Sequence, residues 1–323
     1  EPQYRIATAP SVVKNTAPAA IRICALRVSF PADEDETTTG TGQFLMSAVE
    51  TPCDDEFVVD PAPHNRAYFR DHIRSLANYY NRVSRGKVVI DTTNSEVFPL
   101  NDNNSYQVDH PMAYYHPFLV EDLVDLRLTE LLVEAIQKAD PEVDFAQYDV
   151  VIVFHAGVGQ DFAITLDPTP YDILSAFMNK DDLKAFLAPN DSDFQGIPVE
   201  NGTAFVDCGL ILPESENHLL YDNWAEVFGE SDSPCHYQFG LNGTLAFMFG
   251  FYLGLPCLFD KESGMTGIGR FGLMDQGSAN LSGLVPAVPC AWERVFLGWE
   301  TPVVAKNFED VVLKKVGSAS DTS

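Results

Sequence analysis

Residues 245–259 read LAFMFGFYLGLPCLF, an almost wholly apolar run whose side chains belong in the interior of a folded chain. The run lies inside a longer stretch, residues 237–259, that contains no charged side chain. It is shorter than the ~20 residues that a membrane-spanning helix needs. Two glycines and a proline also interrupt it, and no basic cluster flanks its start. The pattern therefore predicts a buried core helix over about residues 244–253 and no membrane span.

Hydrophobic periodicity predicts the other elements. Runs rich in Val, Ile and Leu indicate strands, and apolar side chains that recur every three or four residues indicate helices. We expect strands over residues 21–30, 87–90, 96–100, 148–155 and 204–212, and helices over about residues 69–83, 117–139 and 181–187. The second and third of these strands are expected to pair as a hairpin, because Asn and Asp residues supply its turns. The order of elements implies an α/β sandwich in one main domain.

The charge balance excludes two classes of partner. The chain has 47 acidic and 20 basic residues, which gives a formal net charge of −27. A field of this sign repels the phosphate backbone of nucleic acids and anionic membrane surfaces. We therefore expect no nucleic-acid binding, and such acidity suits a protein that is soluble in a salty extracellular medium.

Cysteine usage favours secretion. None of the cysteines forms a Cys-x-x-Cys motif, so zinc ribbons and thioredoxin-like redox sites are unsupported. Their even number favours at least one disulfide, and a set of buried free thiols is the alternative. The connectivity stays open among the six, which are Cys24, Cys53, Cys208, Cys235, Cys257 and Cys290.

Several short motifs occur in an order that identifies a family. Residues 250–256 read GFYLGLP, residues 267–275 read GIGRFGLMD, and residues 289–293 read PCAWE. Upstream lie VSRGK at residues 83–87 and VIVFHAGVG at residues 151–159. Together they resemble the secreted zinc metallopeptidases of the immune inhibitor A type.

The resemblance implies a zincin-like metallopeptidase fold, of the α/β (α+β) class, with a mixed twisted sheet and packed helices. It covers residues 21–300. Residues 1–20 then form an N-terminal arm or linker, and residues 301–323 form a C-terminal extension with a polar tail.

In that family the apolar helix carries His-Glu-x-x-His and is followed by a third zinc ligand. Two His at i and i+4 share one helix face and chelate zinc, and the Glu between them is the general base. The glycines fix the register in this chain. The His positions hold Phe247 and Phe251, the Glu position holds Met248, and the third-ligand position holds Cys257. The resemblance therefore implies a degenerate active-site helix with no zinc site and no catalytic residues.

Two other sets of residues could bind a metal in place of the lost zinc ligands. Cys257 alone lacks partner ligands, so a disulfide or an inert thiol is favoured for it. A relocated site built from His155, His218 and His236 is the alternative, but these residues lie on separate segments without ligand spacing. A secreted hydrolase or metallopeptidase with such a non-standard site is the second functional hypothesis.

The acidic loops offer candidates for calcium, which takes six to eight oxygen ligands. Asp260, Glu262 and Asp275 lie in the most family-like stretch, although a solvated acidic surface is the alternative. Met274 is expected to fill space under the apolar helix, as a core methionine does.

The sequence thus favours a secreted, catalytically inactive metallopeptidase homologue with a binding, scaffold or assembly role. A protein or glycan partner, or self-assembly, fits this role.

Overall fold

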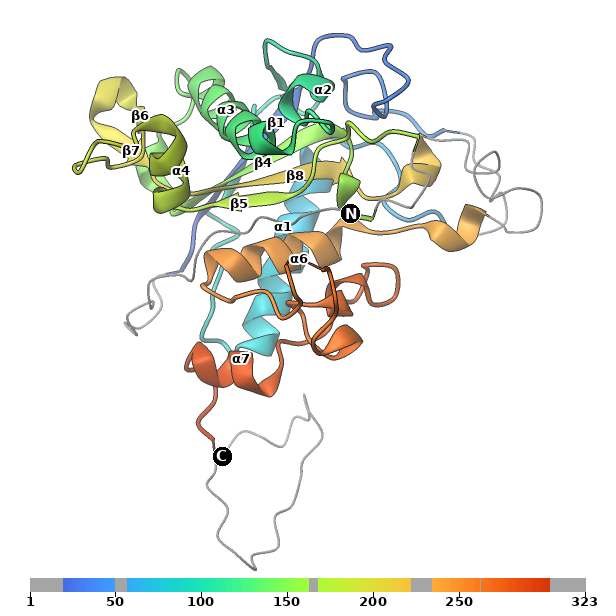
Figure 1. Ribbon diagram of the computed structural model, residues 1–323, viewed down its shortest axis with the longest axis vertical. Coiled ribbons are helices and arrows are strands. Elements are labelled where there is room, and N and C mark those ends of the chain that lie inside the picture. Colours follow the sequence, from blue (N-terminus) through green and yellow to red (C-terminus); the bar gives the residue numbers. More distant parts are fainter. Residues whose placement is uncertain (1–19, 50–56, 163–167, 222–233, 262, 303–323) are drawn as a thin grey trace, which may run out of the picture.

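The computed structural model describes residues 20–49, 57–162, 168–221, 234–261 and 263–302. In this part of the chain a mixed β-sheet lies between two groups of helices (Figure 1). The chain is therefore of the mixed α/β class that the sequence predicted. The arm and the extension expected at residues 1–20 and 301–323 lie almost entirely outside the described residues.

The main sheet has the strand order β2-β1-β4-β8-β5, and β3 also pairs with β1. Pairing is parallel throughout except for β5, which runs antiparallel to β8 at the edge. The central strands β1, β4 and β8 are buried along their whole length, as parallel strands covered on both faces are. The strands are β1 (Ile23–Ser29), β2 (Glu96–Phe98), β3 (Tyr106–Gln107), β4 (Val150–Val158), β5 (Ala176–Met178) and β8 (Gly209–Ser215).

Helices cover both faces of the sheet. In Figure 1, α2 (Met112–Tyr115) and α3 (Glu121–Ala139) lie on one face. On the other face lie α1 (Arg66–Val83) and α6 (Leu241–Tyr252), which pack against each other. The remaining elements are α4 (Lys180–Leu187), α7 (Ala291–Phe296) and a separate antiparallel pair, β6 (Ile197–Val199) and β7 (Ala204–Val206).

The sequence signals of α1 are clear in the structure. The Asn65 side chain caps the helix by accepting hydrogen bonds from the N–H groups of Ala67 and Tyr68. Its buried residues recur every three or four positions, which explains why periodicity found this helix. Gly86, with a φ of 78°, follows the end of the helix as predicted.

The predicted hairpin is wrong. Ile90 makes only an isolated parallel bridge with Ile21, and β2 runs parallel to β1 with Glu96 opposite Cys24. The turn around Asp91 therefore carries the chain onward beside the same strand and does not reverse it. Turn residues alone do not specify that direction, because the choice depends on which strand lies alongside.

Two boundaries also differ from expectation. The helix predicted from residue 117 begins at Glu121, with the short α2 before it. The single strand predicted over residues 204–212 is two strands, β7 and β8, which belong to different sheets. Both are apolar, so hydrophobicity does not separate them, and only their partners do.

The apolar run forms α6, as predicted. In the described part of the chain, no helix combines the length and the apolar character that crossing a membrane requires. Among the cysteines, Cys235 is disulfide-bonded, and Cys53 lies outside the described residues. The other four are free thiols: Cys24, Cys208, Cys257 and Cys290.

Candidate functional site

Helix α6 carries the positions that the sequence singled out. It packs against α1 on one side and against β8 and β5 on another. Nearly all of its residues are buried, as expected for a helix that is apolar all round. Gly254 (φ 93°) ends it, and the Leu255 N–H donates to the Gly250 carbonyl, a Schellman-type ending.

The three helix positions of interest are buried and apolar. Phe247, Met248 and Phe251 are 8%, 1% and 5% exposed, which confirms the expected burial of both phenylalanines. The rings of Phe247 and Phe251 meet edge to face with centroids 4.9 Å apart. Phe259, from the segment after the helix, lies 6.4 Å from Phe247. The face that would present two imidazoles is therefore filled by aromatic rings.

Met274 forms the floor beneath this helix, as the sequence predicted. Its side chain is fully buried, and its Sδ lies against the Cα of Gly250. The Tyr80 hydroxyl donates a hydrogen bond of 2.6 Å to the Ala246 carbonyl from the α1 side. Packing of Met274 against α6, and a buried hydrogen bond from α1 to α6, thus hold these elements together.

Cys257 has a half-buried free thiol. Burial raises its pKa, with Lys261 acting in the opposite direction, so the thiol form is favoured over the thiolate that binds metals. Within the described residues, no three His, Cys, Asp or Glu side chains are grouped so that they would hold a metal ion.

Asp275 organises a turn. Its Oδ2 accepts hydrogen bonds from the N–H groups of Gly267, Ile268 and Gly269 and from the Thr266 hydroxyl, at 2.7–2.9 Å. Burial alone would raise the pKa of this carboxyl, but the hydrogen bonds outweigh burial and lower it. Because N–H donors occupy that oxygen, the carboxylate already has its partners within the protein.

Of the other two calcium candidates, only Asp260 lies within the described residues. Asp260 accepts from the Ser263 hydroxyl at 2.7 Å, in a turn of its own. Glu262 lies outside the described residues.

The histidines considered for a relocated site occupy separate places. His155 is fully buried in β4, where its Nδ1–H donates to the Ala156 carbonyl at 2.9 Å, and burial lowers its pKa to about 4. His218 is buried in the short 3-10 turn after β8. The side chain of His236 is outside the described part. Neither described histidine belongs to a group that would hold a metal.

Sequence reasoning missed a buried cluster of acids and histidines at the carboxyl end of β8. Glu214 Oε2 lies 2.6 Å from His64 Nδ1, and both side chains are fully buried. His64 Nε2 lies 2.8 Å from the Asp60 carbonyl, and the Tyr68 hydroxyl donates to the Glu214 carbonyl. Burial alone would lower the pKa of His64, but the hydrogen bond to Glu214 and the charge of that carboxylate outweigh burial and raise it, which favours the protonated imidazole.

The same cluster extends to the start of α6. His72 Nδ1 contacts Asn242 Oδ1 at 3.0 Å, and its Nε2 lies 3.9 Å from Asp60 Oδ1. Asp60 Oδ2 accepts from the Leu241 N–H at 2.7 Å. In the sequence these acids look like a solvated loop, because charged side chains are rarely buried. For Glu214, the available signal was its position at the carboxyl end of a buried parallel strand, where polar groups of an α/β sheet converge.

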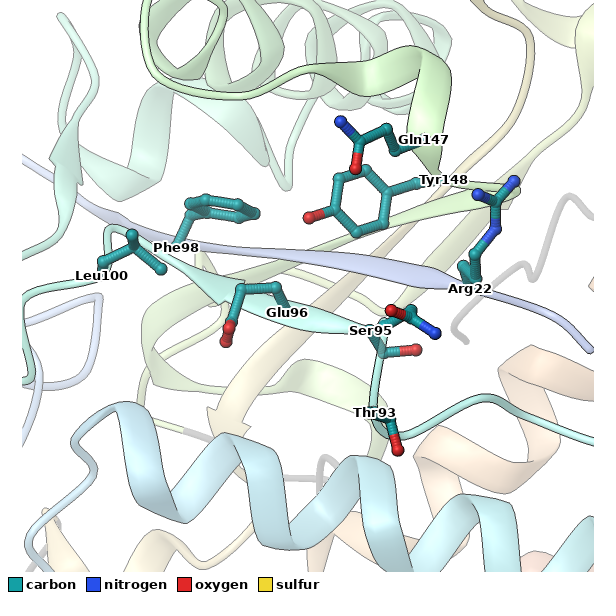
Figure 2. Close-up of a pocket in the computed structure, with 9 residues that line it drawn as sticks. Arg22, Thr93, Ser95, Glu96, Phe98, Leu100, Gln147 and Tyr148 are labelled. Atoms are coloured by element: carbon teal, nitrogen blue, oxygen red, sulfur yellow. The ribbon is translucent and has the colours of Figure 1, made fainter.

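A pocket of about 510 Å³ lies at the β2 edge of the sheet (Figure 2). Phe98 and Tyr148 give it aromatic rings that meet at 6.1 Å, and Arg22 lies at its rim. None of the residues that the sequence singled out lines it. No residue of α6 lines this pocket.

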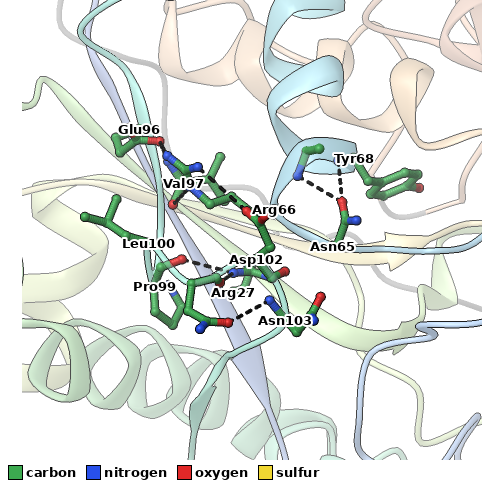
Figure 3. Close-up of polar contacts among 12 residues, drawn as sticks. Arg27, Asn65, Arg66, Tyr68, Glu96, Val97, Pro99, Leu100, Asp102 and Asn103 are labelled. Atoms are coloured by element: carbon green, nitrogen blue, oxygen red, sulfur yellow. Dashed lines mark hydrogen bonds and ion pairs between the residues drawn. The ribbon is translucent and has the colours of Figure 1, made fainter.

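A polar network next to this pocket fixes the loop after β2 (Figure 3). Arg27, 1% exposed in β1, donates to the carbonyls of Pro99, Asn101 and Asp102. Arg66, at the start of α1, pairs with Glu96 at 2.7 Å. Carbonyl acceptors and an ion pair satisfy both guanidinium groups in part, which gives the network a structural role.

No protein-family model matches this chain, and no curated protein matches it.

Proposed function

We propose that this chain is a catalytically inactive zincin-like protein, a pseudopeptidase that resembles the secreted zinc metallopeptidases of the immune inhibitor A type. It acts outside the cell as a binding, scaffold or assembly module. The observation that carries the proposal is the edge-to-face contact of Phe247 and Phe251 on α6, at the two positions where the family has histidine.

The chemistry of these side chains supports the loss of catalysis. Zinc in proteins is bound by nitrogen, oxygen or thiolate donors, and a phenylalanine ring has none. The methionine at the Glu position carries a thioether that does not accept a proton at neutral pH, so it cannot act as a general base. Burial of each apolar side chain contributes about 1.5–3 kcal/mol to folding instead. The helix face therefore acts as core.

The arrangement of the surrounding elements supports the proposed ancestry. The chain has a mixed sheet, two helices that pack against each other on one face, and Met274 against Gly250 of α6, which are features that the resemblance implies. The sequence motifs and this arrangement are independent of the lost ligands, so both remain after the zinc site is gone.

A binding role is supported by exposed apolar side chains in the segment after α6. Apolar side chains gathered at a surface commonly mark interaction sites. Trp292 and Phe296 of α7 stack with ring centroids 5.0 Å apart while both are about half exposed. The largest exposed side chains of this segment are Met265, Phe271, Leu281, Val285, Trp292 and Phe296.

Zinc content and peptidase activity test the proposal together. The purified protein is equilibrated with zinc, dialysed, and analysed for bound metal, and a broad peptide library is then incubated with it. We expect less than stoichiometric zinc and no cleavage. Stoichiometric zinc with cleavage that a chelator abolishes would overturn the proposal and favour the second candidate, a hydrolase with a relocated site.

A further inference from the structure

Glu216 is a buried acid that has no basic partner among the described residues. Its side chain is fully buried just after β8, and no hydrogen bond of ordinary geometry reaches either of its oxygens. In the described part of the chain, no Lys or Arg forms an ion pair with it. Such an uncompensated buried carboxylate is costly, so it is normally protonated or bound to a cation.

Two more oxygen donors converge on Glu216. Glu216 Oε2 and Asp161 Oδ2 lie 2.7 Å and 2.9 Å from the point that a Cβ on Gly159 would occupy. The Thr244 hydroxyl, in the first turn of α6, is 4% exposed and makes no well-formed hydrogen bond within the described residues. It lies close enough to Glu216 to act on that carboxyl. Three chain segments therefore bring oxygen atoms close together, and the missing side chain of Gly159 leaves room for the two carboxyl groups beside it.

The neighbouring histidines do not neutralise this charge. His64 is committed to Glu214 and His72 lies beside Asp60. Asp161 Oδ2 accepts from the N–H and hydroxyl of Ser175, which fixes the orientation of that carboxyl. In the described part of the chain, no basic side chain of this cluster is therefore paired with Glu216.

We propose that Glu216, Asp161 and the Thr244 hydroxyl form a binding site for Ca²⁺. All donors are oxygen, which selects hard cations, and calcium accepts the irregular geometry that three separate segments provide. Water and backbone carbonyls complete the coordination. Because only two ligands are carboxylates, we expect a dissociation constant on the order of 10⁻⁴ M, as in extracellular calcium modules.

The bound ion joins the end of β4, the end of β8 and the start of α6. Calcium binding to the folded state alone shifts unfolding by mass action. At a calcium concentration about a hundredfold above the dissociation constant, we expect the melting temperature to rise by about 5 °C over its value in a chelator.

The experiment compares calcium and EGTA in thermal unfolding, and measures bound calcium by equilibrium dialysis. Glu216→Gln keeps the shape of the side chain and removes its charge, so we expect bound calcium and the thermal shift to disappear. Glu36→Gln, at an exposed acid, is the matched control and is expected to behave as wild type. Thr244→Val is a second variant, for which we expect affinity to fall about tenfold because one ligand is lost.

Any of three results would overturn the site. If wild type binds no calcium and Glu216→Gln is as stable or more stable, the carboxyl is held protonated. If Glu216→Gln binds calcium as wild type does, the ion is bound elsewhere. If Glu216→Gln does not fold, Thr244→Val decides, and unchanged affinity in that variant rejects the site. The result is independent of zinc and of peptidase activity, so it stands apart from the proposed function.

Discussion

Met274 Sδ lies 2.5 Å from the point that a Cβ on Gly250 would occupy, so α6 rests directly on the methionine beneath it. Met274 is fully buried and therefore has little room to move aside. The absence of a side chain at residue 250 is what allows this close approach. The contact fixes the distance between the helix and the turn that contains Asp275.

This contact predicts that Gly250→Ala destabilises the wild-type protein but stabilises the Met274→Ala variant. Gly250→Ala gains about 1 kcal/mol of helix propensity but costs about 1–3 kcal/mol through overpacking against Met274. We expect a net loss of about 1 kcal/mol in wild type. In a Met274→Ala background the same change should stabilise, because the obstructing side chain is gone. Urea unfolding of the four proteins measures both effects, and equal effects in the two backgrounds would contradict the contact.

Phe251→His should destabilise the fold by about 2–4 kcal/mol, because it buries a polar ring in an apolar contact without a hydrogen-bond partner. Phe271→His is the matched control, since Phe271 is 88% exposed and Phe251 only 5%. We expect the control to stay within about 0.5 kcal/mol of wild type in chemical unfolding. A neutral Phe251→His would mean that its ring borders an open groove.

Restoring the family's ligands should restore zinc binding before it restores activity. In the variant Phe247→His, Met248→Glu, Phe251→His, Cys257→Asp, the two imidazoles occupy the helix face where rings already meet at 4.9 Å. We expect zinc uptake, read by metal analysis, while peptide hydrolysis stays absent. Catalysis also needs groups that orient each ligand and stabilise the oxyanion. A variant that folds by circular dichroism and takes up no zinc would refute the register assigned to α6.

Acidification should destabilise the protein through His155. Burial lowers its pKa to about 4 in the folded state, and the unfolded value is about 6.5. The unfolded state therefore binds a proton that the folded state does not, and stability falls as the pH drops from 6.5 towards 4. Between pH 7 and pH 4, the free energy of unfolding should therefore fall by about 3 kcal/mol more in wild type than in His155→Phe. If the free energy of unfolding depends on pH in the same way in both proteins, His155 is not the cause of the acid destabilisation.

Part of the candidate site could be predicted because local chemistry decides it. The residues at positions 247, 248 and 251 lack zinc donors in any fold, and an apolar helix without charges has to be buried. The position of Met274 beneath the helix was expected from the family resemblance, not from the apolar pattern. The calcium candidates chosen from the sequence were less successful, because composition shows carboxylates but does not show that N–H donors already occupy Asp275.

The sequence by itself determined the apolar helix α6, the buried central strands β1 and β4, the strong negative charge and the absence of zinc ligands on α6. Each of these depends on residue type and short-range periodicity, which are read along the chain. Only the tertiary structure decided that β2 runs parallel to β1, and that Glu214 and Glu216 are buried beside His64 and Asp161. Strand direction and the burial of charge are set by contacts between segments that are distant in sequence. The free energy of such contacts comes from packing and desolvation, which exist only once those segments meet.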